Sequence, residues 1–183
     1  MQKITNHFCL SNLRELILIT IFDCKKCKLI RMNYRIIIFL LINFLALAIG
    51  SFFTSKGVPS IWYEELSKAP WTPPGWFFGF AWTSIMICFS VYMAYLWPTS
   101  KNKSLLVTLF LIQWILNTGW NPVFFQFHNV SAGLVIISAL TILIGYFFYA
   151  NWTQLKLKSL LIAPYFIWLI IATSLNAFVL IKN

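Results

Sequence analysis

Five long stretches of this sequence contain no charged side chain, and they determine the solvent in which the chain can fold. Each stretch is 18 to 23 residues long and strongly apolar. A helix rises about 1.5 Å per residue and needs about 20 residues to cross the roughly 30 Å hydrocarbon layer of a bilayer. Because lipid offers no partner for backbone amides, each stretch should be a helix. The predicted spans are Ile36–Phe53, Gly75–Trp97, Leu105–Phe125, Ala132–Ala150 and Ser159–Ile181.

The composition excludes the other broad classes. Charged residues make up 10% of the chain and hydrophobic residues 60%, whereas a soluble domain carries about 25% charged residues. Disorder needs low hydrophobicity and high charge, and a β-barrel would alternate apolar and polar residues in tracts of about ten. We therefore predict an all-α integral membrane protein, a multi-pass bundle of five transmembrane helices. The connection Thr54–Pro74, which holds four prolines, cannot be one continuous helix.

The net charge of +10 follows the pattern of a membrane protein and not that of a nucleic-acid-binding protein. The basic residues lie in the N-terminal segment and in the gaps between spans, without a basic stripe, so we expect no nucleic-acid partner. Their distribution favours a cytoplasmic N-terminus if the host is an inner membrane. The N-terminal side carries Arg31, Arg35, Lys101, Lys103, Lys156 and Lys158, and the opposite side carries Lys56, Lys68 and Lys182.

The N-terminal segment differs from the rest of the chain. We expect residues 1–33 to be an extension, either disordered or untranslated with Met32 as the true start, and residues 34–183 to form the membrane domain. Cys24 and Cys27 form a C-x-x-C without a second pair at ligand spacing, which predicts no metal site. Ala46-Leu-Ala48 resembles a signal-peptidase site, and its use would leave four helices.

The predicted spans lack the groups that most membrane chemistry needs. They contain no acid, base or histidine, so we expect no proton-coupled pump, ion channel, metal site or bound cofactor. Aromatic rings and a few amides remain. An amide should point away from lipid, either to bond another helix or to orient a flat apolar ligand. One face of the third span holds Gln113, Asn117, Trp120 and Phe124, and one face of the fifth holds Tyr165, Trp168, Ala172 and Asn176.

The second span adds a tryptophan and a pair of glycines to this pattern. Gly75 and Gly79 form a G-x-x-x-G, for which close packing inside the bundle is the favoured interpretation over dimerisation. Trp82 lies farther inside the same span. The alternative for the tryptophans in general is an interfacial belt, since indoles prefer the headgroup level.

Three blocks of the sequence resemble the signature of the translocator protein family, also called tryptophan-rich sensory proteins or peripheral-type benzodiazepine receptors. They occur in the family's order on the predicted helices, and with the five spans the likeness covers about residues 34–181. The first is Trp62-Tyr63-x-x-Leu66-x-Lys68, followed by Pro70-Trp71-Thr72-Pro73-Pro74-Gly75-Trp76 and Trp82. The others are Gln113-Trp114-x-Leu116-Asn117-x-x-Trp120-Asn121-Pro122-x-Phe124-Phe125 and Pro164-Tyr165-x-x-Trp168-x-x-x-Ala172-Thr173-x-Leu175-Asn176.

The resemblance implies a five-helix bundle, often a homodimer, with a ligand pocket beneath the long first loop. Family members bind porphyrins, notably protoporphyrin IX, as well as benzodiazepine-type ligands and in many cases cholesterol. Here the sterol motif has Phe178 where the family places a tyrosine, which puts tight sterol binding in doubt. The pocket positions that carry over are Tyr63, Trp82, Asn117, Trp168 and Ala172, with Trp71, Trp120, Phe124, Tyr165 and Asn176 nearby.

We therefore expect a membrane receptor, sensor or transport protein for porphyrins and similar planar hydrophobic ligands. The flat ring would stack on Trp82 and Trp168, Asn117 would supply a hydrogen bond, and the loop that holds Trp71 would close as a lid. Two alternatives stay open. The protein could degrade porphyrin in light, with Trp82 and Trp168 as the oxidisable partners, or it could act by docking another membrane protein.

Overall fold

The computed structural model describes the backbone of residues 2–183 and the side chains of residues 26–183. The chain divides into two compact units, residues 1–35 and 36–183. Met1 lies outside the described residues. The side chain of Cys24, the first cysteine of the C-x-x-C, lies outside the described side chains. Every site residue predicted from the sequence belongs to the second unit.

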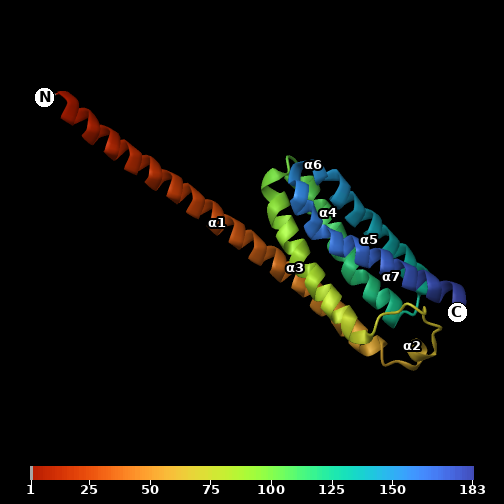
Figure 1. The fold of residues 1–183 in the computed structure, drawn as a ribbon. Helices are drawn as coiled ribbons and strands as arrows, with labels where there is room; N and C mark the ends of the chain where they lie inside the picture. Colours follow the sequence, from red (N-terminus) through yellow and green to blue (C-terminus); the bar gives the residue numbers. More distant parts are fainter. Residues whose placement is uncertain (1) are drawn as a thin grey trace. The chain divides into compact units, whose positions relative to one another are not determined.

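All regular structure in the described residues is helical, which confirms the predicted all-α class. In the second unit, helices α3, α4, α5 and α7 run side by side as a bundle (Figure 1). The elements are α1 (Gln2–Gly57), α2 (Ile61–Glu65), α3 (Gly75–Thr99), α4 (Lys103–Asn121), the π-helical turn η1 (Pro122–Gln126), α5 (Val130–Ala150), α6 (Trp152–Leu155), the 3-10 helix η2 (Lys156–Ile162) and α7 (Ala163–Lys182).

The helices match the apolar stretches of the sequence. Four described stretches are long and apolar enough to cross a membrane: Lys26–Gly57, Gly75–Thr99, Val130–Ala150 and Trp152–Lys182. The stretch predicted from Leu105 to Phe125 forms α4 and η1 but is not among the four. Its amides lower its hydropathy, and two of them, Gln113 and Asn117, are buried inside the bundle. The chain is a multi-pass integral membrane protein.

Polar caps and prolines set the helix ends. The side chains of Ser60, Asn102 and Asn129 accept hydrogen bonds from the first turns of α2, α4 and α5, which satisfies donors that a helix N-terminus leaves free. Pro122 lies where α4 passes directly into the π-helical turn η1, and because it has no N–H it cannot continue the α-helical bonding pattern of α4. Pro164 lies in the first turn of α7, where proline is well tolerated. The long connection between α1 and α3 holds only the short helix α2, as its prolines predict.

The bundle is solid toward one end. From Ile85 onward α3 buries most of its side chains, and Phe89 and Tyr92 are fully enclosed among the rings of α4, α5 and α7. The Tyr92 hydroxyl donates to the Phe147 carbonyl at 2.7 Å. Helix α1 is fastened to α3 there, because the Asn43 amide donates to the Ser90 hydroxyl at 2.8 Å. The first two turns of α3 are different, since a methyl group added at Gly75 or Gly79 would meet no described atom within 4 Å.

Candidate functional site

A cavity of about 590 Å³ occupies the end of the bundle beneath the α1–α3 connection. We call it the main cavity. Its volume falls within the range of about 300 to 1,000 Å³ that is typical of small-molecule sites. Side chains from α1, the connection, α3, α4, η1, α5 and α7 line it. Eight residues predicted from the sequence are in its wall: Tyr63, Trp82, Asn117, Trp120, Phe124, Trp168, Ala172 and Asn176.

Three of the predicted site residues do not line this cavity. Gln113 and Tyr165 are buried in the solid part of the bundle, where the Gln113 amide donates to the Tyr165 hydroxyl at 2.9 Å. They join α4 to α7. Trp71 is 53% exposed; its indole N–H donates to the Ser174 hydroxyl at 3.2 Å, and its ring packs edge-on against Phe178.

The connection between α1 and α3 forms the roof of the main cavity. Ala69, Thr72 and Pro73 contribute to the lining, and Ala69 is almost fully buried. Trp71 and Ser67 hold the roof to the C-terminal part of α7. Trp71 does so through its hydrogen bond and ring contact, and the Ser67 backbone N–H donates to the side-chain oxygen of Asn183, the residue after α7, at 2.9 Å. Trp71 therefore fastens the roof from outside.

The indoles of Trp82 and Trp168 meet at nearly a right angle. Their ring centroids lie 6.4 Å apart and their planes are inclined by 82°. A flat ligand that stacks on one indole must meet the edge of the other, so the expected stacking on both rings at once does not fit this geometry. Phe77 and Phe78 also pack against Trp168, and the Trp168 N–H has no hydrogen-bond partner among the described residues.

A second group of rings forms the α4 side of the wall. Trp120 and Phe124 lie parallel, with centroids 5.1 Å apart and an interplanar angle of 16°. The Asn176 amide holds this group to α7. In the orientation that pairs both of its groups, its oxygen accepts from the Trp120 indole N–H and its nitrogen donates to the Val130 carbonyl, each at 3.1 Å.

The other two wall amides have different roles. The Asn121 oxygen accepts from the Thr54 hydroxyl at 2.9 Å and its nitrogen donates to the Asn117 carbonyl at 3.2 Å, so its groups are used to join α1 to α4. The Asn117 side-chain amide makes no hydrogen bond to any described residue while lining the cavity. The hydrogen-bonding groups of this side chain are therefore not used by the described residues; its ligand role stays a prediction.

The glycines of the G-x-x-x-G motif line the cavity and do not pack against a neighbouring helix. A methyl group added at Gly75 or Gly79 would meet nothing within 4 Å among the described residues, and both lie in the cavity wall. The prediction of close packing inside the bundle at these positions is wrong. What the two glycines provide is volume, because any side chain there would project into the cavity.

Lys68 and a face of α1 are wall components that the sequence reasoning missed. Among the described residues that line the main cavity, Lys68 carries the one charged side chain; its ammonium lies 4.6 Å from the centre of the Tyr63 ring. Burial raises the pKa of the Tyr63 phenol. Helix α1 contributes Ala46, Leu47, Gly50, Ser51 and Thr54. Their helical spacing, and the small size of all but Leu47, could have revealed a cavity-facing side.

Comparison with known proteins gives one consistent result. The profile of the TspO/MBR family matches residues 38–181. The chain is 38% identical to the tryptophan-rich protein TspO of Chlorobaculum tepidum, over 83% of this chain and 99% of the relative. It is 36% identical to the protein of the same name from Archaeoglobus fulgidus, over 73% and 87%. It is 27% identical to the human translocator protein, over 72% and 82%.

Proposed function

The chain belongs to the TspO/MBR family, and on that premise we propose that its main cavity binds porphyrins and similar planar hydrophobic molecules. The protein would then act as a membrane receptor, sensor or transporter for such ligands. The observation that carries the proposal is an aromatic-walled cavity of about 590 Å³ with one free amide and one lysine.

The shape and polarity of the wall favour a flat, mostly apolar ligand. A macrocycle that lies face to face with one of the two perpendicular indoles meets the other by its edge, and both arrangements are favourable for aromatic rings. The Asn117 amide can hydrogen-bond a polar atom of the ligand. Lys68 places an ammonium near the roof, and protoporphyrin carries two propionate groups that complement this charge.

The two tryptophans of the wall can be tested by fluorescence. We expect protoporphyrin to quench the tryptophan emission of the full chain in lipid nanodiscs. Each aromatic contact contributes about 0.5–1.5 kcal/mol, so Trp82→Ala and Trp168→Ala should each weaken binding by about two- to tenfold, and the double variant by more.

Trp76→Ala is the matched control. Trp76 lies on the same helix as Trp82 but is 72% exposed and is not part of the cavity wall. Its removal should leave the affinity unchanged. Unaltered affinity in the Trp82→Ala, Trp168→Ala double variant would contradict the proposal.

A further inference from the structure

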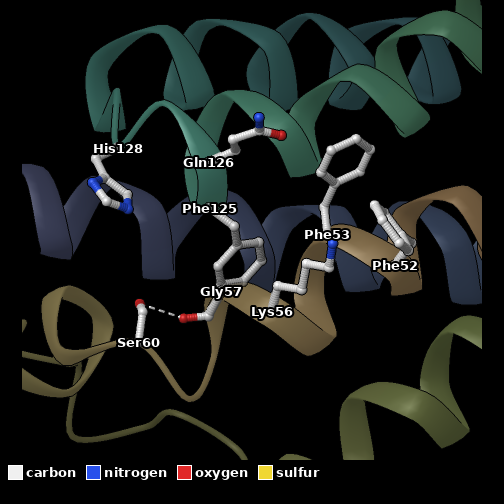
Figure 2. Close-up of a pocket in the computed structure, with 8 residues that line it drawn as sticks. All are labelled: Phe52, Phe53, Lys56, Gly57, Ser60, Phe125, Gln126 and His128. Carbon is white, nitrogen blue, oxygen red and sulfur yellow. Dashed lines mark hydrogen bonds between the residues drawn. The ribbon is translucent and has the colours of Figure 1, made fainter.

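A second, smaller pocket opens where α1 ends. Figure 2 shows the eight residues around its volume of about 410 Å³. It shares only Phe125 with the residues described in the wall of the main cavity. We call it the Lys56 pocket; its lining residues are Phe52, Phe53, Lys56, Gly57, Ser60, Phe125, Gln126 and His128.

The base of the Lys56 pocket is fixed by close backbone packing. A methyl group at Gly57 would overlap the Phe125 ring, so the glycine lets α1 approach η1. The Ser60 hydroxyl donates to the Gly57 carbonyl at 2.6 Å, drawn as a dashed line in Figure 2. It also accepts from the Tyr63 N–H at 3.3 Å. These polar groups serve the fold and are not offered to a ligand.

Three other side chains of the pocket keep their polar groups unused. Lys56, Gln126 and His128 are exposed, and none of their side chains forms a hydrogen bond with another described residue. The Lys56 ammonium lies 4.0 Å above the centre of the Phe52 ring. No carboxylate belongs to the described lining. The pocket thus presents the Lys56 ammonium and the polar side chains of Gln126 and His128 without a carboxylate among its described lining residues.

His128 is held in place at the pocket by its backbone and by a ring stack. Its φ of 52° is in the left-handed region, which is uncommon for residues other than glycine. Its imidazole lies parallel to the Trp62 indole, with centroids 4.1 Å apart and an angle of 15°. The imidazole is therefore positioned by the fold, whereas an ordinary surface histidine would be free to rotate.

We propose that the Lys56 pocket binds the phosphate of an anionic phospholipid, whose acyl chains lie along Phe52 and Phe53. Ammonium, amide and imidazole N–H groups are donors suited to phosphate oxygens. The two phenylalanines are on the last turns of a membrane-spanning helix, where a lysine reaches the headgroup level and attracts anionic lipid. A zwitterionic lipid brings its own cation and gains less from Lys56.

Lipid retention by the full chain tests this proposal. Native mass spectrometry of protein released from nanodiscs should show bound phosphatidylglycerol in preference to phosphatidylcholine. We expect Lys56→Gln to reduce the retained phosphatidylglycerol about tenfold, the effect of one lost charge-assisted hydrogen bond. His128→Ala should also reduce retention.

Lys158→Gln is the matched control. The Lys158 ammonium lies 4.2 Å over the Tyr95 ring, so this variant removes the same charge from a similar aromatic contact outside the pocket. Retention should stay at the wild-type level. Equal losses in both lysine variants, or no loss in Lys56→Gln, would overturn the proposal.

Inorganic phosphate distinguishes a lipid site from a site for the free ion. Millimolar phosphate should leave the phospholipid bound, because it lacks the acyl chains that contact Phe52 and Phe53. Complete displacement by phosphate would overturn the assignment to lipid. The proposal is independent of the porphyrin cavity, since Lys56→Gln should leave protoporphyrin quenching unchanged.

Discussion

Gly79 leaves open volume in the wall of the main cavity that almost any side chain would fill. It lies on the second turn of α3, facing the main cavity, and a methyl group there would meet no described atom within 4 Å. In a helix interior glycine is unfavourable by about 1 kcal/mol relative to alanine. In return for this cost, the absence of a side chain at Gly79 leaves open volume in the cavity whose wall includes Trp82.

Filling that volume should remove binding without harming the fold. We expect Gly79→Leu to weaken protoporphyrin binding by about tenfold or more, as overpacking a site does, while the thermal unfolding midpoint stays the same or rises. Quenching titrations and unfolding scans in the same detergent measure both. Gly119→Leu is the control, because Gly119 also has open space around it but does not line the cavity. A Gly79→Leu variant that binds normally would refute this role of the glycine.

Lys68 makes a separate prediction about the ligand's charge. An exposed ion pair contributes about 0.2–1 kcal/mol, so Lys68→Gln should weaken protoporphyrin binding about two- to fivefold. The dimethyl ester of protoporphyrin has no carboxylates. Its affinity should therefore be the same for the wild-type protein and for the Lys68→Gln variant. Quenching titrations with the two ligands make the comparison. Equal weakening for acid and ester would show that Lys68 acts through shape alone.

At the scale of elements, the end of α1 is positioned by two glycines with different neighbours. At Gly57 an added methyl group would overlap the Cβ and ring of Phe125, which lie close to the η1 backbone. At Gly50 it would come within 2.8 Å of the Asn121 side-chain nitrogen, the far end of a side chain that can turn aside.

These neighbours predict a graded effect on stability. Gly57→Ala should lower the free energy of unfolding by about 1–3 kcal/mol, the usual cost of overpacking. Gly50→Ala should cost less, about 1 kcal/mol for the Asn121 hydrogen bond to Thr54 that it disturbs. Thermal unfolding of the two variants in one detergent shows which of them loses more stability. A larger loss in Gly50→Ala would mean that α1 does not pack on η1 as described.

The helices themselves were predictable, because hydrocarbon leaves a chain no other way to satisfy its backbone. The uncharged stretch from Gly75 became α3 with its predicted start. Pro164 lies in the first turn of α7, and Pro122 lies where α4 changes into the π-helical turn η1. The sequence could not reveal which partner each amide side chain of α4 contacts. Gln113, Asn117 and Asn121 share a helical spacing, yet one bonds Tyr165, one faces the cavity and one holds Thr54.

At the scale of the whole second unit, solid packing and hollow space occupy opposite ends of the same helices. Spacing predicted which faces of α4 and α7 point inward, and eight of the eleven predicted site residues line the main cavity. Spacing could not predict which positions along the length of the bundle border the cavity and which are enclosed by solid core. Tyr165 is one turn from Trp168 but is enclosed by solid core, and the perpendicular arrangement of Trp82 and Trp168 depends on ring rotations that no sequence spacing encodes.

The most direct test of the central claim is a structure of the full chain bound to protoporphyrin. We predict a macrocycle inside the main cavity, parallel to one of the indoles of Trp82 and Trp168 and edge-on to the other, with a polar atom within hydrogen-bond distance of the Asn117 amide. A porphyrin bound on the lipid-facing surface while this cavity stays free of it would contradict the account.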